Sequence, residues 1–505
     1  MKRGIFAIIN IGASAFRMLV CEYLNGQERL LEYMIKPLSL GKDTFTKGYI
    51  SLDNVNKATV ILRNFKHKLD EYHIGKNYRA LCTSGVREAR NRYFFIDHIK
   101  VNTGIELNVL EPSDEIYIKY VGVKGKLKAF KEMEKKGLLF ANVSSGNVSI
   151  SIHKNNVMVY SAALPYGNLR LNEIFQYISV VNRYKAYQHY VANMFYTIKN
   201  ALPSKFSFQY VVCSGSSINL LLEVLKPKGD FFKKKDLMKI YDDIKTIAVD
   251  DVVRLYNMRR LDAEILLPTL TTYINMLSFT GLNEIHFTRV NFPAMLSGFF
   301  TNILRDGGLN NRLRKTFFYI GARFNFDKNH AKIVTKFALN IFDNIKAIHS
   351  LKNKERFLLE AASIMHEVGY FINARDHEEH SYHIIKSLSM PGLSKESINI
   401  IALISLLHRD NPYISHEDKL YDLNISERLI VYKLASILKI ADSLDASHKN
   451  IVSDIDVIQG DGRLKIVARS WTHPFLEELA FSKKSKLFLE NYGIKPELEI
   501  KIDYE

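Results

Sequence analysis

The chain has 505 residues, of which 47% are hydrophobic, and its formal net charge is +17. This length predicts roughly three or four domains of about 100 to 200 residues each. No run approaches the roughly 18 uninterrupted apolar residues of a membrane span, and the N-terminus shows no cleavage-site pattern. Three scattered cysteines without metal-binding spacing suit a reducing compartment. We therefore expect a cytoplasmic protein with no signal peptide and no membrane partner.

The positive charge has two interpretations. A basic surface attracts polyanions, which include nucleic acid, anionic membranes and phosphate-rich small molecules. The chain is also rich in Lys, Asn and Ile throughout, which is typical of biased genome composition. Because Lys and Arg are scattered and no aromatic–basic recognition motif accompanies them, specific nucleic-acid binding is the weakest candidate.

The first third of the chain alternates strands and helices. Short apolar or alternating runs predict three successive strands, followed by an amphipathic helix over 51–74 with Ser51 as its N-cap. A strand at 78–84 leads into a predicted helix over 85–104, which ends at a glycine. Another short strand then leads into a helix that begins near Ser113.

The same pattern starts again near residue 138. The segments "FAIINIGASAFRMLV" (6–20) and "LFANVSSGNVSISIH" (139–153) both have an apolar strand, a small polar turn and an alternating strand. Aligned with each other, Asn10 matches Asn142 and Gly12 matches Ser144. This duplication predicts two related lobes that face one cleft, where each turn presents backbone N–H groups that suit phosphate oxygens.

The pattern changes again from about residue 310. Amphipathic helices run to about 448 and carry most of the clustered histidines, and a hairpin, a helix and a strand follow. We expect boundaries near 125, 305 and 450. The predicted domains are a first lobe at 1–125, a second lobe at 126–305, a helical domain at 306–450 and a small α+β domain at 451–505.

An ordered set of motifs resembles the exopolyphosphatase/guanosine pentaphosphate phosphohydrolase (Ppx/GppA) family. The motifs are "TSGVREARN" (83–91), "GIELNVLEPSDEIYIKYVGV" (104–123), "LPYGNLRLNEIF" (164–175), "LLEAASIMHEVGYFI" (358–372), "DHEEHSYHII" (376–385) and "LASILKIADSLDASH" (434–448). The resemblance implies an α/β fold of two actin-like (ribonuclease H-like) lobes, an all-α HD-like domain and a small α+β C-terminal domain. It also implies release of terminal phosphate from inorganic polyphosphate or from pppGpp, with magnesium, by a homodimer.

The resemblance assigns the catalytic base to Glu115. In-line attack on phosphorus needs a carboxylate that orients and deprotonates water, together with cations that hold the developing charge. The alternative is that Glu115 and Asp114 only stabilise a helix N-terminus through its dipole.

The resemblance also implies phosphate contacts from Arg17, Arg87 and Asn91. Arg87 and Asn91 are four residues apart, so we expect both on one helix face. Arginine suits the task because its planar fork binds two oxygens at once. The alternative for Arg87 is an exposed ion pair with Glu88 or with a neighbouring acid.

The two turns differ from the family pattern. The family has Asp-x-Gly-Ser-Asn-Ser in the first turn and Asp-x-Gly-Gly-Gly-Ser in the second, and both aspartates are asparagines here. The phosphate-binding residues implied in the two turns are Asn10, Gly12, Ala13, Ser14, Asn142, Ser144, Ser145, Gly146 and Asn147.

These differences leave catalysis open. A loss of even about 3 kcal/mol in metal binding is roughly a hundredfold in affinity, although polyphosphate can carry magnesium on its own oxygens. Serines at two glycine positions also add Cβ atoms where phosphate approaches the backbone. The alternative is a catalytically weakened regulatory protein that binds polyphosphate or a guanosine alarmone.

The helical domain is a separate candidate. The positions that match the metal ligands of HD phosphohydrolases are His330, His366, Glu367 and Asp442, with Glu replacing the usual Asp. Such ligands suit a transition metal, and His377, His380 and His408 are candidates for a second site. The alternative is structural histidines, with His377 and His380 on an exposed helix and with Asp442 and Asp445 pinning helices together. A metal-dependent HD phosphohydrolase is thus the third functional hypothesis.

Overall fold

The computed structural model describes residues 4–24, 27–127, 129–203, 206–288, 308–409, 417–460 and 462–502. The chain divides into two compact units, Met1–Asp306 (unit 1) and Gly307–Glu505 (unit 2). The further division of each unit, near residues 125 and 450, stays a prediction.

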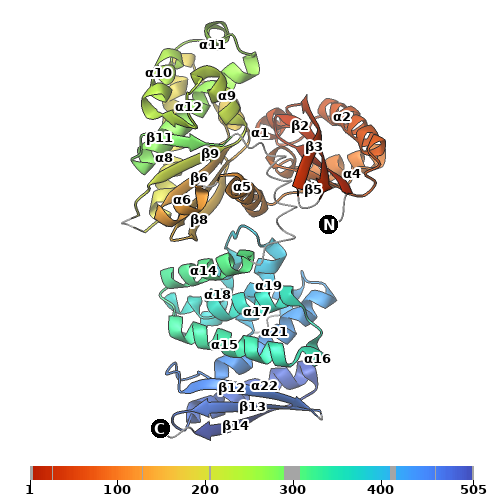
Figure 1. The fold of residues 1–505 in the computed structure, drawn as a ribbon, viewed down its shortest axis with the longest axis vertical. Coiled ribbons are helices and arrows are strands. Elements are labelled where there is room, and N and C mark those ends of the chain that lie inside the picture. The colour runs from red at the N-terminus through yellow and green to blue at the C-terminus, as the bar shows by residue number, and fades with distance from the viewer. Residues whose placement is uncertain are drawn as a thin grey trace. The chain divides into compact units, whose positions relative to one another are not determined.

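The first sheet of unit 1 has five strands in the order β3-β2-β1-β4-β5. β2, β3 and β5 of this sheet are labelled in Figure 1. β1 pairs antiparallel with β2 and parallel with β4. The apolar side chains of Ala7, Ile9 and Ile11 alternate along β1 and join one core with the apolar face of α2. The strands are β1 (Gly4–Ile11), β2 (Ala15–Leu24), β3 (Gln27–Pro37), β4 (Tyr78–Cys82) and β5 (Leu107–Val109).

The second sheet of unit 1 repeats this arrangement. Its order is β10-β11-β9-β6-β7-β8, so β6, β7, β8 and β9 occupy the positions that β1, β2, β3 and β4 have in the first sheet. β6 likewise pairs antiparallel with β7 and parallel with β9. The strands are β6 (Leu138–Val143), β7 (Val148–Lys154), β8 (Val157–Leu164), β9 (Tyr210–Ser214), β10 (Phe231–Lys233) and β11 (Glu284–Phe287). The repeat predicted from the sequence is therefore present in the fold.

Helices pack around both sheets. The side chain of Ser51 accepts a hydrogen bond from the Asn54 N–H, which confirms Ser51 as the N-cap of α2. α5 packs against β7 and β8. The helices of unit 1 include α1 (Leu40–Lys47), α2 (Leu52–Glu71), α3 (Ser84–Arg87), α4 (Arg92–Thr103), α5 (Pro112–Lys126), α6 (Phe130–Lys136), α7 (Asn168–Phe175), α8 (Val180–Ala201), α9 (Ser216–Leu225), α10 (Lys234–Ile244), α11 (Val249–Tyr256) and α12 (Arg260–Thr280).

The single helix expected over 85–104 is wrong, because the chain breaks it into α3 and α4. Asn91 lies at the break and bonds both backbone groups of Ile50: its Oδ1 accepts from the N–H at 2.9 Å, and its Nδ2 donates to the carbonyl at 2.8 Å. A short amide side chain that satisfies neighbouring backbone in this way competes with helix continuation. The end of α4 at Gly104, which is left-handed with a φ of 69°, agrees with the prediction.

Unit 2 consists of helices and a three-stranded sheet, β12-β13-β14. One continuous core joins the apolar faces of the helices to Val452, Ile455 and Leu464 of the sheet. The described elements are α14 (Gly308–Arg323), α15 (Lys328–Asn344), α16 (Lys346–His349), α17 (Asn353–Met365), the 3₁₀ helix η1 (Val368–Phe371), α18 (His377–Lys386), α19 (Lys395–Leu406), α20 (Glu417–Leu420), α21 (Ile425–Ser443), β12 (Val452–Gly460), β13 (Arg463–Ser470), α22 (Phe475–Tyr492) and β14 (Pro496–Ile502). Within the described ranges, no helix is both long and apolar enough to span a bilayer.

Candidate functional site

Two loops of unit 1 have the same turn. In the loop between β1 and β2, the Gly12 N–H donates to the Ala15 carbonyl at 3.1 Å. In the loop between β6 and β7, the Ser144 N–H donates to the Asn147 carbonyl at 3.0 Å. The sequence alignment of the two segments therefore corresponds to equivalent backbone geometry. We call residues 12–14 the first loop and residues 144–147 the second loop.

The two loops meet directly. The Ser145 hydroxyl donates to Ser14 Oγ at 2.9 Å and so links one loop to the other. Gly146 of the second loop also packs closely on α3, because a Cβ at this position would lie 2.1 Å from Ser84 Oγ. Both loops thus face one shared space, as the duplication predicts.

A cavity of about 140 Å³ lies between the loops. Most of the predicted phosphate-binding residues and the predicted base line it: Asn10, Gly12, Ala13, Ser14, Arg17, Glu115, Asn142, Ser144, Ser145 and Gly146. Arg87, Asn91 and Asn147 are not among the lining residues. Sequence reasoning did not identify the remaining ones, Tyr33, Ile35, Thr83, Ser84, Lys119, Gly215, Ser216, Asn219 and Thr288.

The two asparagines that end the first strands have different partners. Asn142 Nδ2 donates to Ser214 Oγ at 2.8 Å. Asn10 is 3% exposed, and its Oδ1 has no hydrogen-bond partner within the described part of the chain. A buried acceptor of this kind needs a donor from outside the protein, such as water.

Glu115 is buried between two cations. Lys119, one turn further along α5, places its Nζ 2.6 Å from Glu115 Oε1, and Arg87 Nη1 lies 3.2 Å from Oε2. Burial alone would raise the pKa of Glu115, but the charges of Lys119 and Arg87 outweigh it and lower the pKa. Glu115 is therefore an ionised carboxylate and more than a helix-terminal acid.

Arg87 does not form the exposed pair with Glu88 that the alternative interpretation supposed. Its Nη1 also donates to the Leu110 carbonyl at 2.8 Å. Asn147 of the second loop, with its amide oxygen turned toward Arg87, accepts from Nη2 at 2.8 Å. Glu88 instead forms an ion pair with Arg170. Arg87 thus connects the predicted base to the second loop but is not itself among the residues that line the cavity.

Asn91 is not brought to the cavity. The expectation that it shares a helix face with Arg87 is wrong, because the break between α3 and α4 separates them and both ends of its amide are bonded to Ile50. Asn91 fixes the backbone at this position through its two bonds to Ile50.

The cavity residues do not fit a magnesium site. Mg²⁺ prefers carboxylate and other hard oxygen ligands in octahedral geometry. Among the described residues that line the cavity, Glu115 is the only carboxylate, and Lys119 and Arg87 already contact both of its oxygens. Asn10 and Asn142 offer neutral amides only. Magnesium that reaches this cavity would have to arrive on the phosphate chain.

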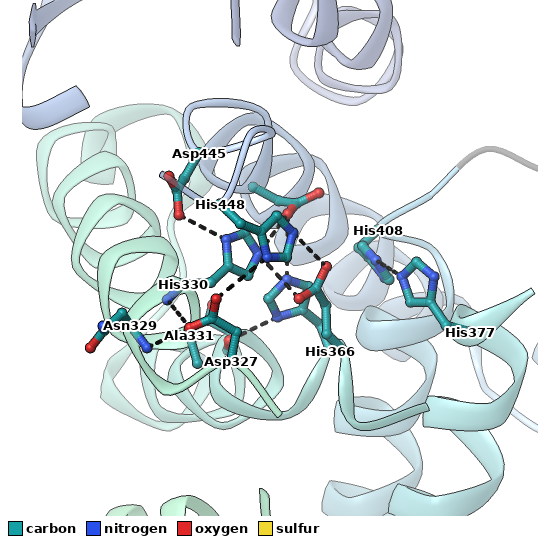
Figure 2. Close-up of polar contacts among 12 residues, drawn as sticks. Asp327, Asn329, His330, Ala331, His366, His377, His408, Asp445 and His448 are labelled. Atoms are coloured by element: carbon teal, nitrogen blue, oxygen red, sulfur yellow. Dashed lines mark hydrogen bonds and ion pairs between the residues drawn. The ribbon is translucent and has the colours of Figure 1, made fainter. Parts of the chain in front are cut away.

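A second candidate lies inside unit 2. One ligand atom from each of four buried residues lies within 4.8 Å of the others: His330, His366, Glu367 and Asp442. His330 Nε2 is 3.3 Å from Asp442 Oδ1 and 3.5 Å from Glu367 Oε2, and His366 Nε2 is 3.4 Å from Asp442 Oδ1 (Figure 2). The structure thus brings together all four predicted ligands.

Polar contacts at Nδ1 hold the imidazoles of His330 and His366 in place. His330 Nδ1 lies 2.9 Å from Asp445 Oδ2, and His366 Nδ1 lies 2.9 Å from the Ser363 carbonyl. The inner Nε2 atoms of both rings have no hydrogen-bond partner in the described structure. Imidazoles fixed through one nitrogen, with the other turned toward carboxylates, are typical of metal ligands. The donor set of the cluster therefore fits a metal ion.

Charged groups surround the cluster. Burial opposes protonation of His330, but Asp442 and Asp445 outweigh it and raise its pKa to about 10. Burial also opposes ionisation of Asp442, yet Lys484, which contacts Asp442 Oδ2, and the neighbouring histidines hold its pKa well below the usual range. The cluster thus concentrates negative charge around the imidazoles.

The histidines beyond the cluster differ from the alternative prediction of an exposed helix. His377 is buried, and its Nε2 lies 3.2 Å from His408 Nε2 (Figure 2). Its ring stacks on that of Tyr370 at 4.0 Å between centroids. Gly369 is the second residue of η1, which follows α17, and a Cβ at this glycine would lie 2.0 Å from the His377 carbonyl. Close packing at this glycine therefore lets α18 approach η1 and keeps His377 buried.

Comparisons with known proteins agree with this arrangement. The sequence profile of the Ppx/GppA phosphatase family matches residues 23–289, and the profile of Ppx/GppA phosphatase domain III matches residues 314–478. The chain belongs to the Ppx/GppA phosphatase family. It is thus related to phosphatases over most of its length.

Individual relatives span nearly the whole chain. A guanosine-5'-triphosphate,3'-diphosphate pyrophosphatase from Aliivibrio fischeri is 21% identical over 484 residues, which are 90% of this chain and 91% of the relative. A protein of the same name from Pseudoalteromonas atlantica is 21% identical over 95% of each chain. Among solved structures, an exopolyphosphatase from Cytophaga hutchinsonii matches 59% of this chain and 98% of its own, with a TM-score of 0.53 and 18% identity. This last likeness shows the α/β fold.

Proposed function

We propose that this family member is a phosphohydrolase that releases the terminal phosphate of inorganic polyphosphate or of pppGpp from the cavity between its two loops. The observation that carries the proposal is that the first loop, the second loop and the buried carboxylate of Glu115 line one cavity. The names of the relatives, a pyrophosphatase of a guanosine compound and an exopolyphosphatase, support both substrates.

The cavity favours an anion. Its charged lining residues are Arg17, Glu115 and Lys119, which sum to one positive charge. Turns that present backbone N–H groups add partial positive charge on both sides. A phosphate chain that enters the cavity would therefore meet a positive environment from both loops.

Glu115 acts as the general base in this proposal. The oxygens of a bound phosphate compete with Glu115 for Lys119, and as this cation turns to the substrate the pKa of Glu115 rises toward a more basic value. Glu115 then takes a proton from water while the water oxygen forms a bond to the terminal phosphorus. The bridging P–O bond breaks, and the electron pair leaves with the shortened chain. Asn10 Oδ1, which has no donor among the described residues, accepts the other hydrogen of the water.

The test compares neighbouring acids on α5. Glu115→Gln should lower phosphate release from tripolyphosphate and pppGpp by about 10² to 10⁴-fold, the usual contribution of a general base. Asp114→Asn, which changes the adjacent acid by the same chemistry, should retain the wild-type rate. Ligand binding is followed in parallel by thermal stabilisation. Full activity of Glu115→Gln would remove Glu115 from the mechanism.

The same assay distinguishes the regulatory alternative. If tripolyphosphate or pppGpp stabilises the wild-type protein but no phosphate is released in a single turnover, the protein is a binding protein. The two asparagines and the ion pairs of Glu115 would then account for the lost activity. Release by wild-type protein would contradict that alternative.

A second candidate function concerns unit 2. We propose that His330, His366, Glu367 and Asp442 hold a transition-metal ion, because the Nε2 atoms of both histidines lack hydrogen-bond partners among the described residues. Such an ion, when bound, supplies a Lewis acid that activates water. Asp445 and the Ser363 carbonyl orient the two rings. Metal analysis of the purified protein is the first test.

A further inference from the structure

We propose that the ammonium group of Lys119 takes the place of a divalent cation in the cavity, so that this protein binds a condensed phosphate chain without a divalent metal. The inference rests on the proposed function, since it concerns the same cavity and the same class of ligand. It assigns to Lys119 a binding role that follows from its position and from the charges around it.

Lys119 lies at the wall of the cavity. It is four residues after Glu115 on α5, so both side chains project from one helix face. Its Nζ contacts Glu115 Oε1 at 2.6 Å and Ser149 Oγ of β7 at 3.3 Å, and the residue is only 2% exposed. The carboxylate of Glu115 compensates the buried side chain of Lys119. Lys119 thus places an ammonium group at a fixed position next to the two loops.

The remaining lining groups suit an ammonium better than a metal ion. Both strand-end positions are amides, Asn10 and Asn142, and neither adds the negative charge that would attract a divalent ion. Glu115 has Lys119 on one oxygen and Arg87 on the other. A divalent ion would have to displace a cation from this carboxylate, in a cavity whose described charged residues already sum to a positive charge. The chemistry of the lining therefore selects anions.

A phosphate chain benefits from the same arrangement. Charge-assisted hydrogen bonds from Lys and Arg to phosphate oxygens are shorter and about twice as strong as neutral ones. Lys119, Arg17 and the loop N–H groups would together supply the positive charge that a metal ion normally brings to a polyphosphate. A lysine holds this charge at a fixed position but lacks the adjustable coordination geometry of a hydrated ion.

The test is a calorimetric titration of the full-length protein with inorganic tripolyphosphate. Protein and ligand are freed of metals and titrated with excess EDTA, then with magnesium instead. The wild-type Kd in EDTA should stay within about threefold of the Kd in magnesium, a difference of less than about 1 kcal/mol. Binding that EDTA abolishes and magnesium restores would overturn the proposal.

Variants assign the effect to Lys119. In EDTA, Lys119→Met should weaken binding by about 10- to 100-fold, the scale of a lost charged hydrogen bond, and Lys119→Arg should restore most of it. Lys131→Met removes the same charge from an exposed position on α6 and should bind as wild type. Wild-type affinity of Lys119→Met in EDTA would overturn the proposal. If that variant fails to fold, Glu115→Gln/Lys119→Met is compared with Glu115→Gln, because the pair then leaves no ion-pair partner behind.

Failure of the inference is distinguishable from failure of the hydrolase proposal. Wild-type protein that binds tripolyphosphate in EDTA but never releases phosphate would overturn the hydrolase and support the role of Lys119. Protein that releases phosphate in magnesium but does not bind the chain in EDTA would overturn the role of Lys119 and support the hydrolase.

Discussion

The cavity of unit 1 and the histidine cluster of unit 2 both place a lysine against a buried carboxylate, Lys119 on Glu115 and Lys484 on Asp442. The surroundings of the two pairs differ. In the cavity the carboxylate has a second cation, Arg87, and the nearby strand-end residues are amides. In the cluster, Asp442 is accompanied by the carboxylate of Glu367 and by two imidazoles whose inner nitrogens have no hydrogen-bond partner in the described chain.

This comparison shows that residue type alone does not define a metal site. Both regions contain a buried carboxylate, yet of the two the cluster alone has donor atoms directed at one another and several acidic groups around them. In the cavity, cations occupy the carboxylate and the lining is net positive. The same chain therefore has one region whose chemistry suits an anion and another whose chemistry suits a metal cation.

The largest effect is expected for the cluster. His366→Ala should lose the bound transition metal entirely, because it removes one of two imidazole ligands. His383→Ala, at an exposed position on α18, should keep the metal content of the wild type. Metal is measured by mass spectrometry after gel filtration. Equal metal content in wild type and His366→Ala would contradict the assignment.

Replacing the two strand-end asparagines of the cavity with aspartates should make it a better site for a divalent metal ion. Asn10→Asp/Asn142→Asp adds two negative charges beside Glu115, and a change of about 3 kcal/mol corresponds to roughly a hundredfold in affinity. Tripolyphosphate binding in EDTA should weaken by about that factor and recover in magnesium. Asn108→Asp, at an exposed position on β5, serves as the control for added charge. If the double variant still binds in EDTA as wild type, the amides do not set the charge preference of the cavity.

The close packing of the second loop on α3 should matter to a smaller degree. In Gly146→Ala the new Cβ would lie 2.1 Å from Ser84 Oγ of α3, so Ser84 or the second loop must move. Overpacking of this kind costs about 1 to 3 kcal/mol, which predicts a roughly tenfold loss of tripolyphosphate affinity by calorimetry. Gly460→Ala, where an added Cβ meets nothing within 4 Å, is the matched control. Unchanged affinity in Gly146→Ala would show that the close packing of the second loop on α3 is not required for binding.

The smallest expected effect is a difference between the pH profile of kcat and the pH profile of kcat/KM. In the free enzyme Lys119 and Arg87 outweigh burial and lower the pKa of Glu115, and we expect substrate to draw Lys119 away from that carboxylate. Since kcat/KM reports the free enzyme and kcat the complex, the acid limb of kcat should lie at higher pH than that of kcat/KM. In Lys119→Met the pKa of Glu115 is no longer lowered by that lysine, so the kcat/KM limb should move up toward the kcat limb. Coincident limbs in the wild type would contradict competition between substrate and carboxylate.

The sequence predicted the loops well because their signal is local. A strand that ends in Asn, a small polar turn and an alternating strand fix the hairpin geometry, and the repetition of that pattern predicted two facing loops. Glu115 was found through family resemblance. Lys119 was missed, although its spacing of four residues from Glu115 on a helix was visible in the sequence and predicts contact.

Other features depend on contacts that no local pattern reveals. The break before α4 follows from the bonds between Asn91 and Ile50, which are 41 residues apart. The burial of His377 depends on packing around Gly369, and the pair between Lys484 and Asp442 joins helices that are distant in sequence. Helical periodicity predicts these elements but does not identify which side chains meet between them.

The most direct measurement is a crystal structure of Glu115→Gln grown with inorganic tripolyphosphate and without divalent metal. We expect the terminal phosphate in the cavity between the first and second loops, with one of its oxygens within hydrogen-bond distance of Lys119 Nζ. A phosphate chain bound elsewhere on the protein, with this cavity filled by water alone, would contradict the account.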